Sequence, residues 1–297
     1  MIRPTLLLLV LAATSCDNGP LGDVTDVTLG AYGFATPESA QHDPDADVYL
    51  VSNIAGDPFG KDDNGFISRL APDGKQLAMR WIDGASPDVT LHAPKGIALT
   101  ADELWVADID EVRRFDRKTG APRGSVAILG ATFLNDVAVG TDGSVYVSDT
   151  GVGPGFAPTG TDAIWRIDPK AGTASVFVRG KDLDQPNGLW ADADGVFAVT
   201  WSSGKLLTFS VTGARAADIQ LPKAQLDGIV RLPDGRFLVT SWEGRCAYLV
   251  GKDGKATAWM HPLLDAPADL GLDLRRGRAL IPAFQKDELR ITLFPKP

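Results

Sequence analysis

The stretch "LNDVAVGTDGSVYVSDTG" (Leu134–Gly151) contains the unit that decides the fold. A polar residue precedes a short apolar strand, an Asp-Gly turn follows, and a second strand rich in Val and Tyr ends at "SD". Short β-branched and aromatic runs on either side of an Asp-Gly turn are typical of a β-hairpin. Asn135 is unexpected in this pattern, because its polar amide stands where a core strand begins.

The same unit recurs along the chain. Matching stretches are "TPESAQHDPDAD" (36–47), "APKGIALTADE" (93–103), "QPNGLWADADG" (185–195) and "LDGIVRLPDGR" (226–236), with a weaker copy at 266–284. A third strand follows each hairpin, and a fourth follows most of them. The copies are spaced about 46 residues apart, which is typical of propeller blades. The pattern therefore predicts an all-β, six-bladed β-propeller over residues 24–297.

The last unit ends after its third strand. We expect "DVTLGAYGF" (26–34) to supply the missing outer strand by pairing with residues 288–294, so that an N-terminal strand closes the ring. Without this pairing the last blade would have a long exposed edge.

The N-terminus has the features of an export signal. Residues 1–15 combine a basic start with an apolar run too short to span a bilayer, and "AATSC" resembles a bacterial lipobox. We expect Cys16 to be lipidated and residues 16–23 to be a tether. The protein would then be a membrane-anchored protein of the bacterial cell envelope, on the periplasmic face. An ordinary signal peptide with an incidental cysteine is the alternative.

Charge and cysteine content limit the function classes. The formal net charge is −9, and the charges are scattered. An acidic surface without a basic stripe argues against nucleic acid and anionic lipid as binding partners. Cys246 is the only cysteine besides Cys16, so no intrachain disulfide is possible once Cys16 carries lipid, and the domain must then be stable through its core alone. We expect a monomer that acts on a small molecule.

Polar residues from different blades are expected to meet at one mouth of the central channel, where the innermost strands begin. The matching positions hold Glu38, Lys95, Asn135, Asn187, Asp227 and Ala268. Loops after the second strands should surround the same mouth and contribute Asn53, Trp201 and Trp242 to a substrate pocket.

The oxygen-rich part of this ring is suited to a cation. Two carboxylates and two carboxamides, from Glu38, Asp227, Asn135 and Asn187, would repel or stay unsatisfied unless a divalent ion joined them. All-oxygen ligands favour Ca²⁺, with Mg²⁺ or Mn²⁺ as alternatives. Two other interpretations remain open: each residue caps its local turn, or the ammonium of Lys95 pairs with the carboxylates in place of a metal.

These motifs carry a family resemblance. "PESAQHDPDADVYLVSNIAG", "LNDVAVGTDGSVYVSDTG", "QPNGLWADADG" and "LDGIVRLPDGRFLVTSWEG" resemble the gluconolactonase, or senescence marker protein/regucalcin, family, whose superfamily includes paraoxonases and diisopropylfluorophosphatases. The resemblance implies a six-bladed propeller with a catalytic divalent metal. It also implies that Glu38, Asn135, Asn187 and Asp227 hold the metal.

Two classes of function follow from this pattern. The first is a metal-dependent hydrolase of a lactone or related ester, in which Asp227 is the catalytic base or metal-bound nucleophile. The second is a non-catalytic, membrane-anchored binding propeller similar to NHL-repeat proteins. A metal-free enzyme similar to strictosidine synthase is a third option. Propellers host all three, so the fold does not decide between them.

Overall fold

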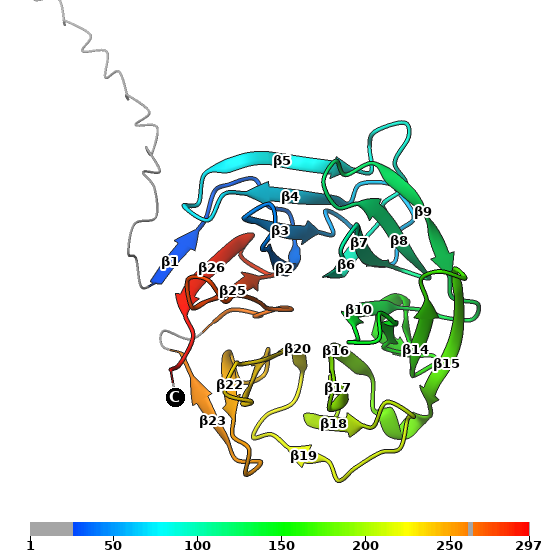
Figure 1. The fold of residues 1–297 in the computed structure, drawn as a ribbon, viewed down its shortest axis with the longest axis vertical. Helices are drawn as coiled ribbons and strands as arrows, with labels where there is room; N and C mark the ends of the chain where they lie inside the picture. Colours follow the sequence, from blue (N-terminus) through cyan, green and yellow to red (C-terminus); the bar gives the residue numbers. More distant parts are fainter. Residues whose placement is uncertain (1–25, 261–263, 297) are drawn as a thin grey trace, which may run out of the picture.

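The computed structural model describes residues 26–260 and 264–296, and within these ranges the strands form six four-stranded antiparallel sheets arranged as the blades of a propeller (Figure 1). Blade 1 consists of β2 (Pro37–Asp43), β3 (Val48–Asn53), β4 (Phe66–Leu70) and β5 (Gln76–Asp83). Blade 2 consists of β6 (Pro94–Leu99), β7 (Glu103–Asp108), β8 (Glu111–Asp116) and β9 (Pro122–Ala127). Blade 3 consists of β10 (Leu134–Val139), β11 (Val145–Asp149), β14 (Ala163–Asp168) and β15 (Thr173–Arg179).

Blades 4 to 6 complete the ring. Blade 4 consists of β16 (Pro186–Asp192), β17 (Gly195–Thr200), β18 (Lys205–Phe209) and β19 (Ile219–Gln220). Blade 5 consists of β20 (Leu226–Arg231), β21 (Phe237–Ser241), β22 (Cys246–Val250) and β23 (Ala256–Trp259). Blade 6 consists of β24 (Gly271–Asp273), β25 (Arg278–Ala283), β26 (Glu288–Leu293) and β1 (Asp26–Leu29). A small hairpin of β12 (Val152–Gly153) and β13 (Ala157–Pro158) follows β11, and the short 3-10 turns are η1 (Pro154–Phe156) and η2 (Lys181–Leu183). The predicted all-β propeller is confirmed.

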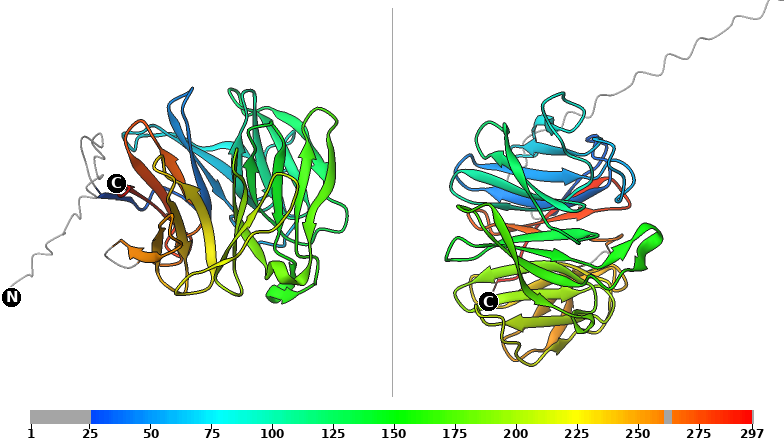
Figure 2. Two further views of the ribbon diagram at one scale, coloured as in Figure 1. Left: turned by 60° about the horizontal axis from the view of Figure 1, so that its bottom comes forward. Right: turned by 90° about the vertical axis from the view of Figure 1, so that its right-hand side faces the viewer.

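The ring closes through the N-terminal strand, as predicted. β1 pairs antiparallel with β26, from Asp26 opposite Thr292 to Leu29 opposite Leu289 (Figures 1 and 2). The strand is shorter than the expected 26–34. The chain turns away after Leu29, because Ala31 and Gly33 both have positive φ, which is incompatible with a continuing strand. The outer edge of the last blade is thereby covered.

The core consists of apolar layers between neighbouring blades, as the absence of an intrachain disulfide requires. One layer joins Trp105 of β7 to Trp165 of β14 across the second and third blades. Cys246 of β22 is buried in another layer between the fourth and fifth blades. These layers hold the inner strands at fixed positions around the channel (Figure 1).

Each of the five strands β2, β6, β10, β16 and β20 contains a β-bulge near its start. On β10, Leu134 pairs with Asp149 and Val137 with Val147, so Asn135 and Asp136 together oppose one residue of β11. The same two-against-one register occurs in the other four strands. A bulge re-aims side chains: Asn135 lines a cavity at one mouth of the channel, whereas Asp136 lines a cavity at the other end.

Glycine follows the polar residue in several bulges because the inner strands approach one another closely. A Cβ on Gly188 would lie 2.2 Å from the backbone oxygen of Asp227. A Cβ on Gly228 would lie 2.6 Å from the Cα of Asp269. The "NG" and "DG" motifs therefore set the distance between blades as well as the site chemistry.

Two predictions concern residues outside those described. The signal peptide, Cys16 and the tether fall within residues 1–25, so the predicted lipid anchor is not addressed by the structure. Within the described ranges, no helix has the length and apolar character needed to cross a membrane.

Candidate metal centre and substrate cavity

The structure brings the predicted quartet together at one mouth of the channel. Glu38 of β2, Asn135 of β10, Asn187 of β16 and Asp227 of β20 line one cavity of about 420 Å³. All four side chains are buried. They come from four different blades, so no local turn accounts for their convergence.

Three oxygens of the quartet have no hydrogen-bond donor among the described residues. They are Oε2 of Glu38, Oδ1 of Asn135 and Oδ1 of Asp227, and each is buried. A buried acceptor without a donor is costly, and several such acceptors in one cavity favour a missing cation. No cluster of three His, Cys, Asp or Glu side chains in metal-binding geometry occurs in the described ranges. A cation here would therefore depend on the amide oxygens.

Thr150, at the end of β11, fixes the orientation of the Asn135 amide. Its hydroxyl donates its single hydrogen to the carbonyl oxygen of Pro186 at 2.9 Å. Thr150 Oγ1 must therefore accept the 3.0 Å hydrogen bond from Nδ2 of Asn135. This leaves Oδ1 of Asn135 as the atom without a partner, as a cation ligand requires.

The carboxyl groups of the channel are strongly perturbed. Burial raises the pKa of Glu38 well above its usual range, and the charges of Asp227, Asp269 and Asp136 raise it further, whereas Lys95 lowers it. Burial and the charge of Asp269 likewise raise the pKa of Asp227, while the nearby indole N–H of Trp242 lowers it. This N–H is buried and has no acceptor among the described residues within hydrogen-bonding distance, so it lies close to Asp227 without being bonded to it. Without a counter-ion, these groups hold protons at a pH where exposed carboxyls are ionised.

Lys95 enters the cavity from β6 and is fully buried. Its ammonium donates to the carbonyl oxygens of Ala93 at 3.0 Å and Pro58 at 3.3 Å, and lies 4.3 Å from the ring centre of Phe133. Burial lowers its pKa to about 8. Among the described ion pairs, none joins Lys95 to Glu38, so the open alternative of an ammonium paired directly with that carboxylate is not what the structure contains.

Aromatic side chains surround the rest of the cavity. Trp201 and Trp242, which the sequence assigned to the pocket, both line it. Sequence analysis missed Phe133 as a pocket residue. Phe156 and Phe284 also line the cavity, and both lie in loops after second strands, which were expected to surround this mouth. Phe133, Gln185 and Gln225 each stand two residues before a quartet member. They precede the inner strands, and Gln185 and Gln225 have positive φ, so the period-two alternation of a strand does not identify them.

Asn53 does not line the cavity, and its prediction as a pocket residue is wrong. Its Oδ1 accepts the backbone N–H of Ala35 at 3.0 Å, and its Nδ2 donates to Ser68 and to the carbonyl of Val51. Asp108 and Asp149 occupy the same place at the ends of β7 and β11, where each accepts backbone N–H groups of the segment entering an inner strand. Asn53 therefore holds the backbone, and the cavity is lined instead by its neighbour Ile54.

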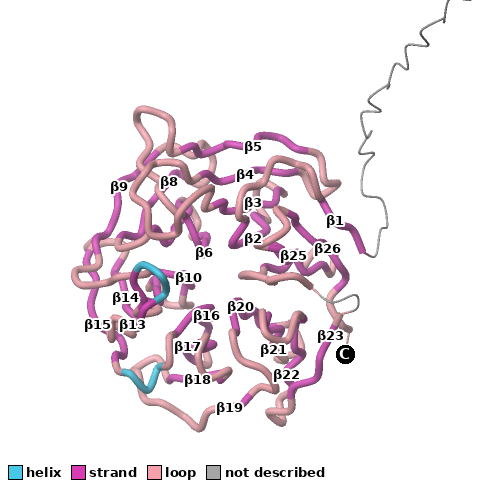
Figure 3. The backbone as a smooth tube through the Cα atoms, turned by 180° about the vertical axis from the view of Figure 1, so that it is seen from behind, coloured by secondary structure: helices cyan, strands magenta, loops and turns pink. Residues whose placement is uncertain are grey.

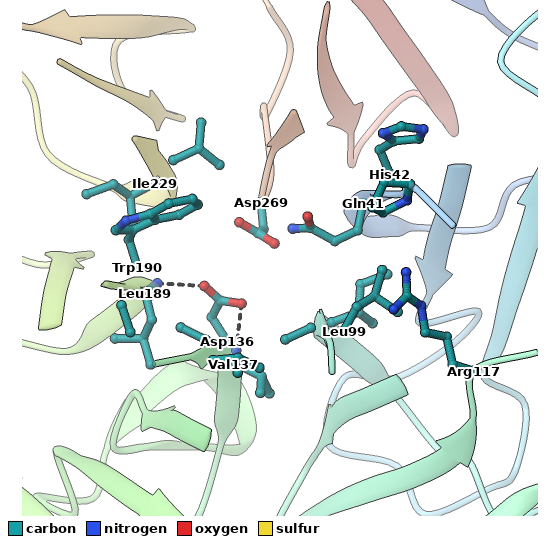
Figure 4. A pocket seen from close by; sticks show the side chains of 17 residues that line it. Gln41, His42, Leu99, Arg117, Asp136, Val137, Leu189, Trp190, Ile229 and Asp269 are labelled. Atoms are coloured by element: carbon teal, nitrogen blue, oxygen red, sulfur yellow. Dashed lines mark hydrogen bonds between the residues drawn. The ribbon is translucent and has the colours of Figure 1, made fainter. Parts of the chain in front are cut away.

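A second cavity of about 310 Å³ occupies the opposite end of the channel (Figure 4). Asp136 and Asp269 face it, and apolar side chains of the inner strands form its walls. Asp136 accepts the backbone N–H groups of Val137 and Leu189, both at 2.6 Å. Asp269 accepts from the hydroxyl of Ser39 at 2.5 Å. The carboxylates at this end are therefore satisfied by the chain itself.

Comparison with known proteins supports the fold. No family model and no curated protein matches the chain. Similar solved structures include a putative gluconolactonase (TM-score 0.68, 18% identity, 90% of this chain and 91% of that one) and a gluconolactonase from Xanthomonas campestris (TM-score 0.67, 17% identity, 93% and 92%). Virginiamycin B lyase from Staphylococcus aureus is similar too (TM-score 0.64, 14% identity, 91% and 99%).

At these identities the likeness concerns the fold and not the activity. The predicted resemblance to gluconolactonase-like proteins is confirmed at that level: this chain has the six-bladed propeller architecture that those gluconolactonases and the lyase share.

Proposed function

We propose that this protein is a divalent-cation-dependent hydrolase of a lactone or related ester, acting at the channel mouth lined by the quartet. The observation that carries the proposal is the set of three buried oxygens without donors, on Glu38, Asn135 and Asp227, in one cavity. A ring of turn caps would leave no such atoms, because a capping oxygen accepts a backbone N–H.

The quartet would hold Ca²⁺, with Mg²⁺ or Mn²⁺ as alternatives. The carboxylates of Glu38 and Asp227 balance the charge of a divalent ion, and the amides of Asn135 and Asn187 add oxygen ligands without adding repulsion. When bound, such a cation polarises a carbonyl and lowers the pKa of a bound water.

The protein's own groups would supply binding and proton transfer. Asp227 is the proposed base, because it lines the cavity, and its buried Oδ1, which has no donor among the described residues, could accept a proton from the attacking water. The ammonium of Lys95 has two backbone acceptors, which leaves its third hydrogen for an oxygen of the substrate. Trp201 and Trp242 would exclude water from the reacting group.

Cation binding is tested by thermal unfolding of the whole protein in Ca²⁺ and in chelator, with elemental analysis of protein purified without chelator. At a hundredfold excess over Kd we expect the ion to stabilise the native state by about 2.7 kcal/mol. Asp227→Ala should lose this stabilisation together with lactone hydrolysis. The control is Asp253→Ala, which removes an exposed aspartate of an outer turn.

The outcomes separate the candidate functions. An unchanged melting temperature with no co-purified metal would contradict a cation site and leave a metal-free protein. Cation binding without hydrolysis of any lactone or ester would favour the non-catalytic binding propeller.

We also propose that Cys16 is lipidated and anchors the protein at the periplasmic face of a bacterial membrane. Small residues before this cysteine and the apolar run before them support the proposal. Wild-type protein should partition into detergent, and Cys16→Ser should move it to the soluble fraction. Wholly soluble wild-type protein with an unmodified cysteine would contradict the anchor.

A further inference from the structure

Two aromatic walls flank the quartet. On one side, the ring centre of Phe133 lies 4.8 Å from that of Phe59 and 6.1 Å from that of Phe156. On the other side, the ring centre of Trp242 lies 5.2 Å from that of Trp201 and 5.0 Å from that of Phe284. Apart from Phe59, each of these side chains lines the quartet cavity, to which Ile54, Pro58 and Val152 add further apolar surface.

Backbone hydrogen bonds fix the position of both walls. The N–H of Phe133 donates to Asp149 at 3.0 Å. The N–H groups of Trp201 and Trp242 donate to the carbonyls of Gln185 and Gln225, both at 2.9 Å. These rings therefore form a preformed surface for a ligand, not loose side chains that fill space.

Phe156 extends the first wall outward from the mouth. It ends the 3-10 turn η1 between β12 and β13, which lies beside β10 and β14 in Figure 3. Its ring contacts those of Phe59 and Phe133 edge to face, yet the residue is 59% exposed. A large aromatic residue left half in solvent at the rim of a cavity has apolar surface available for a ligand.

Hydrogen-bonding groups are scarce outside the quartet. Among the described residues that line the cavity, the other polar side chains are those of Lys95, Thr150, Gln185 and Gln225, besides the indole N–H groups. Thr150 is already committed to Asn135 and Pro186. The remaining partners are Lys95, the amides of Gln185 and Gln225 and the indole N–H groups. Hydroxyl groups of a polyhydroxylated sugar lactone that lie against the aromatic walls would therefore be buried without partners, which is unfavourable.

We propose that the site selects lactones or esters whose non-reacting part is apolar, and that this alkyl or aromatic part lies between the Phe133–Phe156 wall and the Trp201–Trp242 wall. The proposal rests on the proposed hydrolase function, because the quartet fixes where the ester group sits. It adds that polyhydroxylated sugar lactones are poor substrates. Phe156 and Trp201 are then specificity-determining residues.

The test is a series of γ-lactones with unbranched alkyl substituents of increasing length, compared with glucono-δ-lactone. With Ca²⁺-loaded, full-length protein, kcat/KM should rise about fourfold per methylene until the walls are covered. Glucono-δ-lactone should lie below the shortest alkyl lactone. Phe156→Ala and Trp201→Ala should each reduce the dependence on chain length.

Leu274→Ala is the matched control, because Leu274 is 60% exposed and lies in the turn after β24, outside the quartet cavity. It should leave the chain-length dependence unchanged. Binding of alkyl-substituted γ-lactams, which resist hydrolysis, is measured in parallel by tryptophan fluorescence.

The outcomes distinguish the proposed hydrolase activity from the proposed preference for apolar substrates. Efficient hydrolysis of glucono-δ-lactone with no dependence on alkyl length would overturn the apolar-substrate proposal while leaving the hydrolase intact. Length-dependent lactam binding without hydrolysis of any lactone would refute the hydrolase and retain apolar recognition. Lactam binding that is independent of chain length in wild-type protein, with no hydrolysis, would overturn both.

Discussion

The two ends of the central channel contain similar residues in opposite states. At the mouth, Glu38 and Asp227 face the cavity with an unpartnered oxygen each. At the far end, Asp136 and Asp269 are equally buried, but Asp136 accepts hydrogen bonds from Val137 and Leu189 (Figure 4). Asp269 accepts one from Ser39.

The charged groups around the far cavity are paired as well. Arg117 binds both oxygens of Asp43, at 2.6 and 3.0 Å, and His42 lies 3.0 Å from Asp47. Cavity size and buried charge are therefore similar at the two ends, and the difference lies in hydrogen-bond satisfaction. The far end is completed by the protein itself, whereas at the mouth the proposed cation would supply the partner that the chain does not.

The largest expected contrast comes from two single substitutions, Asp227→Asn and Asp136→Asn. Asp227→Asn should abolish cation stabilisation and lower kcat/KM by about a thousandfold or more, because it removes a charged ligand and the proposed base. The metal-free variant should be no less stable than wild type, since the lost oxygen has no donor and repulsion with Glu38 falls.

Asp136→Asn should behave in the opposite way. Its carboxylate accepts two backbone N–H groups with different oxygens, and an asparagine can accept only one of them, so the protein should lose about 1–3 kcal/mol with or without cation. Urea unfolding in Ca²⁺ and in chelator measures both variants. Loss of the cation response in Asp136→Asn but not in Asp227→Asn would reverse the comparison between the two ends.

The next effect concerns the buried ammonium at the mouth. Lys95→Met keeps the length of the side chain and should lower kcat/KM by about a hundredfold if the ammonium donates to the developing charge on the substrate. Cation affinity should not fall, because a nearby positive charge is removed. Steady-state kinetics and a cation titration check this, with Lys255→Met, an exposed lysine of an outer turn, as control. Weaker cation binding would instead mean that Lys95 orders the quartet.

A tenfold loss of Ca²⁺ affinity is expected from Thr150→Val, which keeps the shape of the side chain but removes the hydroxyl. Without an acceptor for Nδ2, the amide of Asn135 can turn its nitrogen toward the cation, so Ca²⁺ should bind about tenfold more weakly. Calorimetric titration measures the affinity. Restored affinity in Thr150→Ser would show that the hydroxyl acts by orienting Asn135. Unchanged affinity in Thr150→Val would show that Thr150 does not affect cation binding.

The propeller and the quartet were predictable from the sequence because the blades repeat, so that residues at the same position of each repeat are expected to meet at one mouth of the channel. The ring closure by residues near Asp26 also followed from counting strands. The bulge was not predictable in this way. It sends Asn135 and Asp136, adjacent in the chain, to opposite ends of the channel, and no feature of the motif "ND" distinguishes the oxygen that stays free from the one that accepts a backbone N–H.

Asn53 shows the same limit. An amide at the end of a second strand is predicted to line the pocket. Only the three-dimensional structure shows that the oxygen of this amide accepts a hydrogen bond from the N–H of Ala35. The aromatic walls were only partly predictable, because Phe156 lies in an irregular loop whose turn brings it over Phe133. Sequence repeats identify which residues converge, but hydrogen-bond satisfaction depends on backbone geometry that the repeats do not encode.

The smallest expected effect is a pH dependence of stability that is steeper in the metal-free protein than in the cation-bound protein. Burial raises the pKa of Asp269 to about 7. Burial, together with the charges of neighbouring carboxylates, raises the pKa values of Glu38, Asp136 and Asp227 well above their usual range. A carboxyl whose pKa is higher in the folded state binds protons more tightly there. Stability is therefore lost as the pH rises from about 4, the carboxyl pKa in the unfolded chain, through the folded values.

In chelator, the free energy of unfolding should accordingly fall by at least about 1 kcal/mol between roughly pH 5 and pH 8, as measured by urea unfolding. Saturating Ca²⁺ should reduce the decline, because the ion stabilises the ionised forms of Glu38 and Asp227. The remaining slope belongs to Asp136 and Asp269, which have only the chain's own donors. Titration of Lys95 would raise stability with increasing pH, because its pKa is lowered to about 8 in the folded protein, but this effect begins only above that pH and so lies outside this range. An identical slope with and without Ca²⁺ would mean that the titrating carboxyls lie at the far end alone, and the two ends would no longer differ in the way proposed.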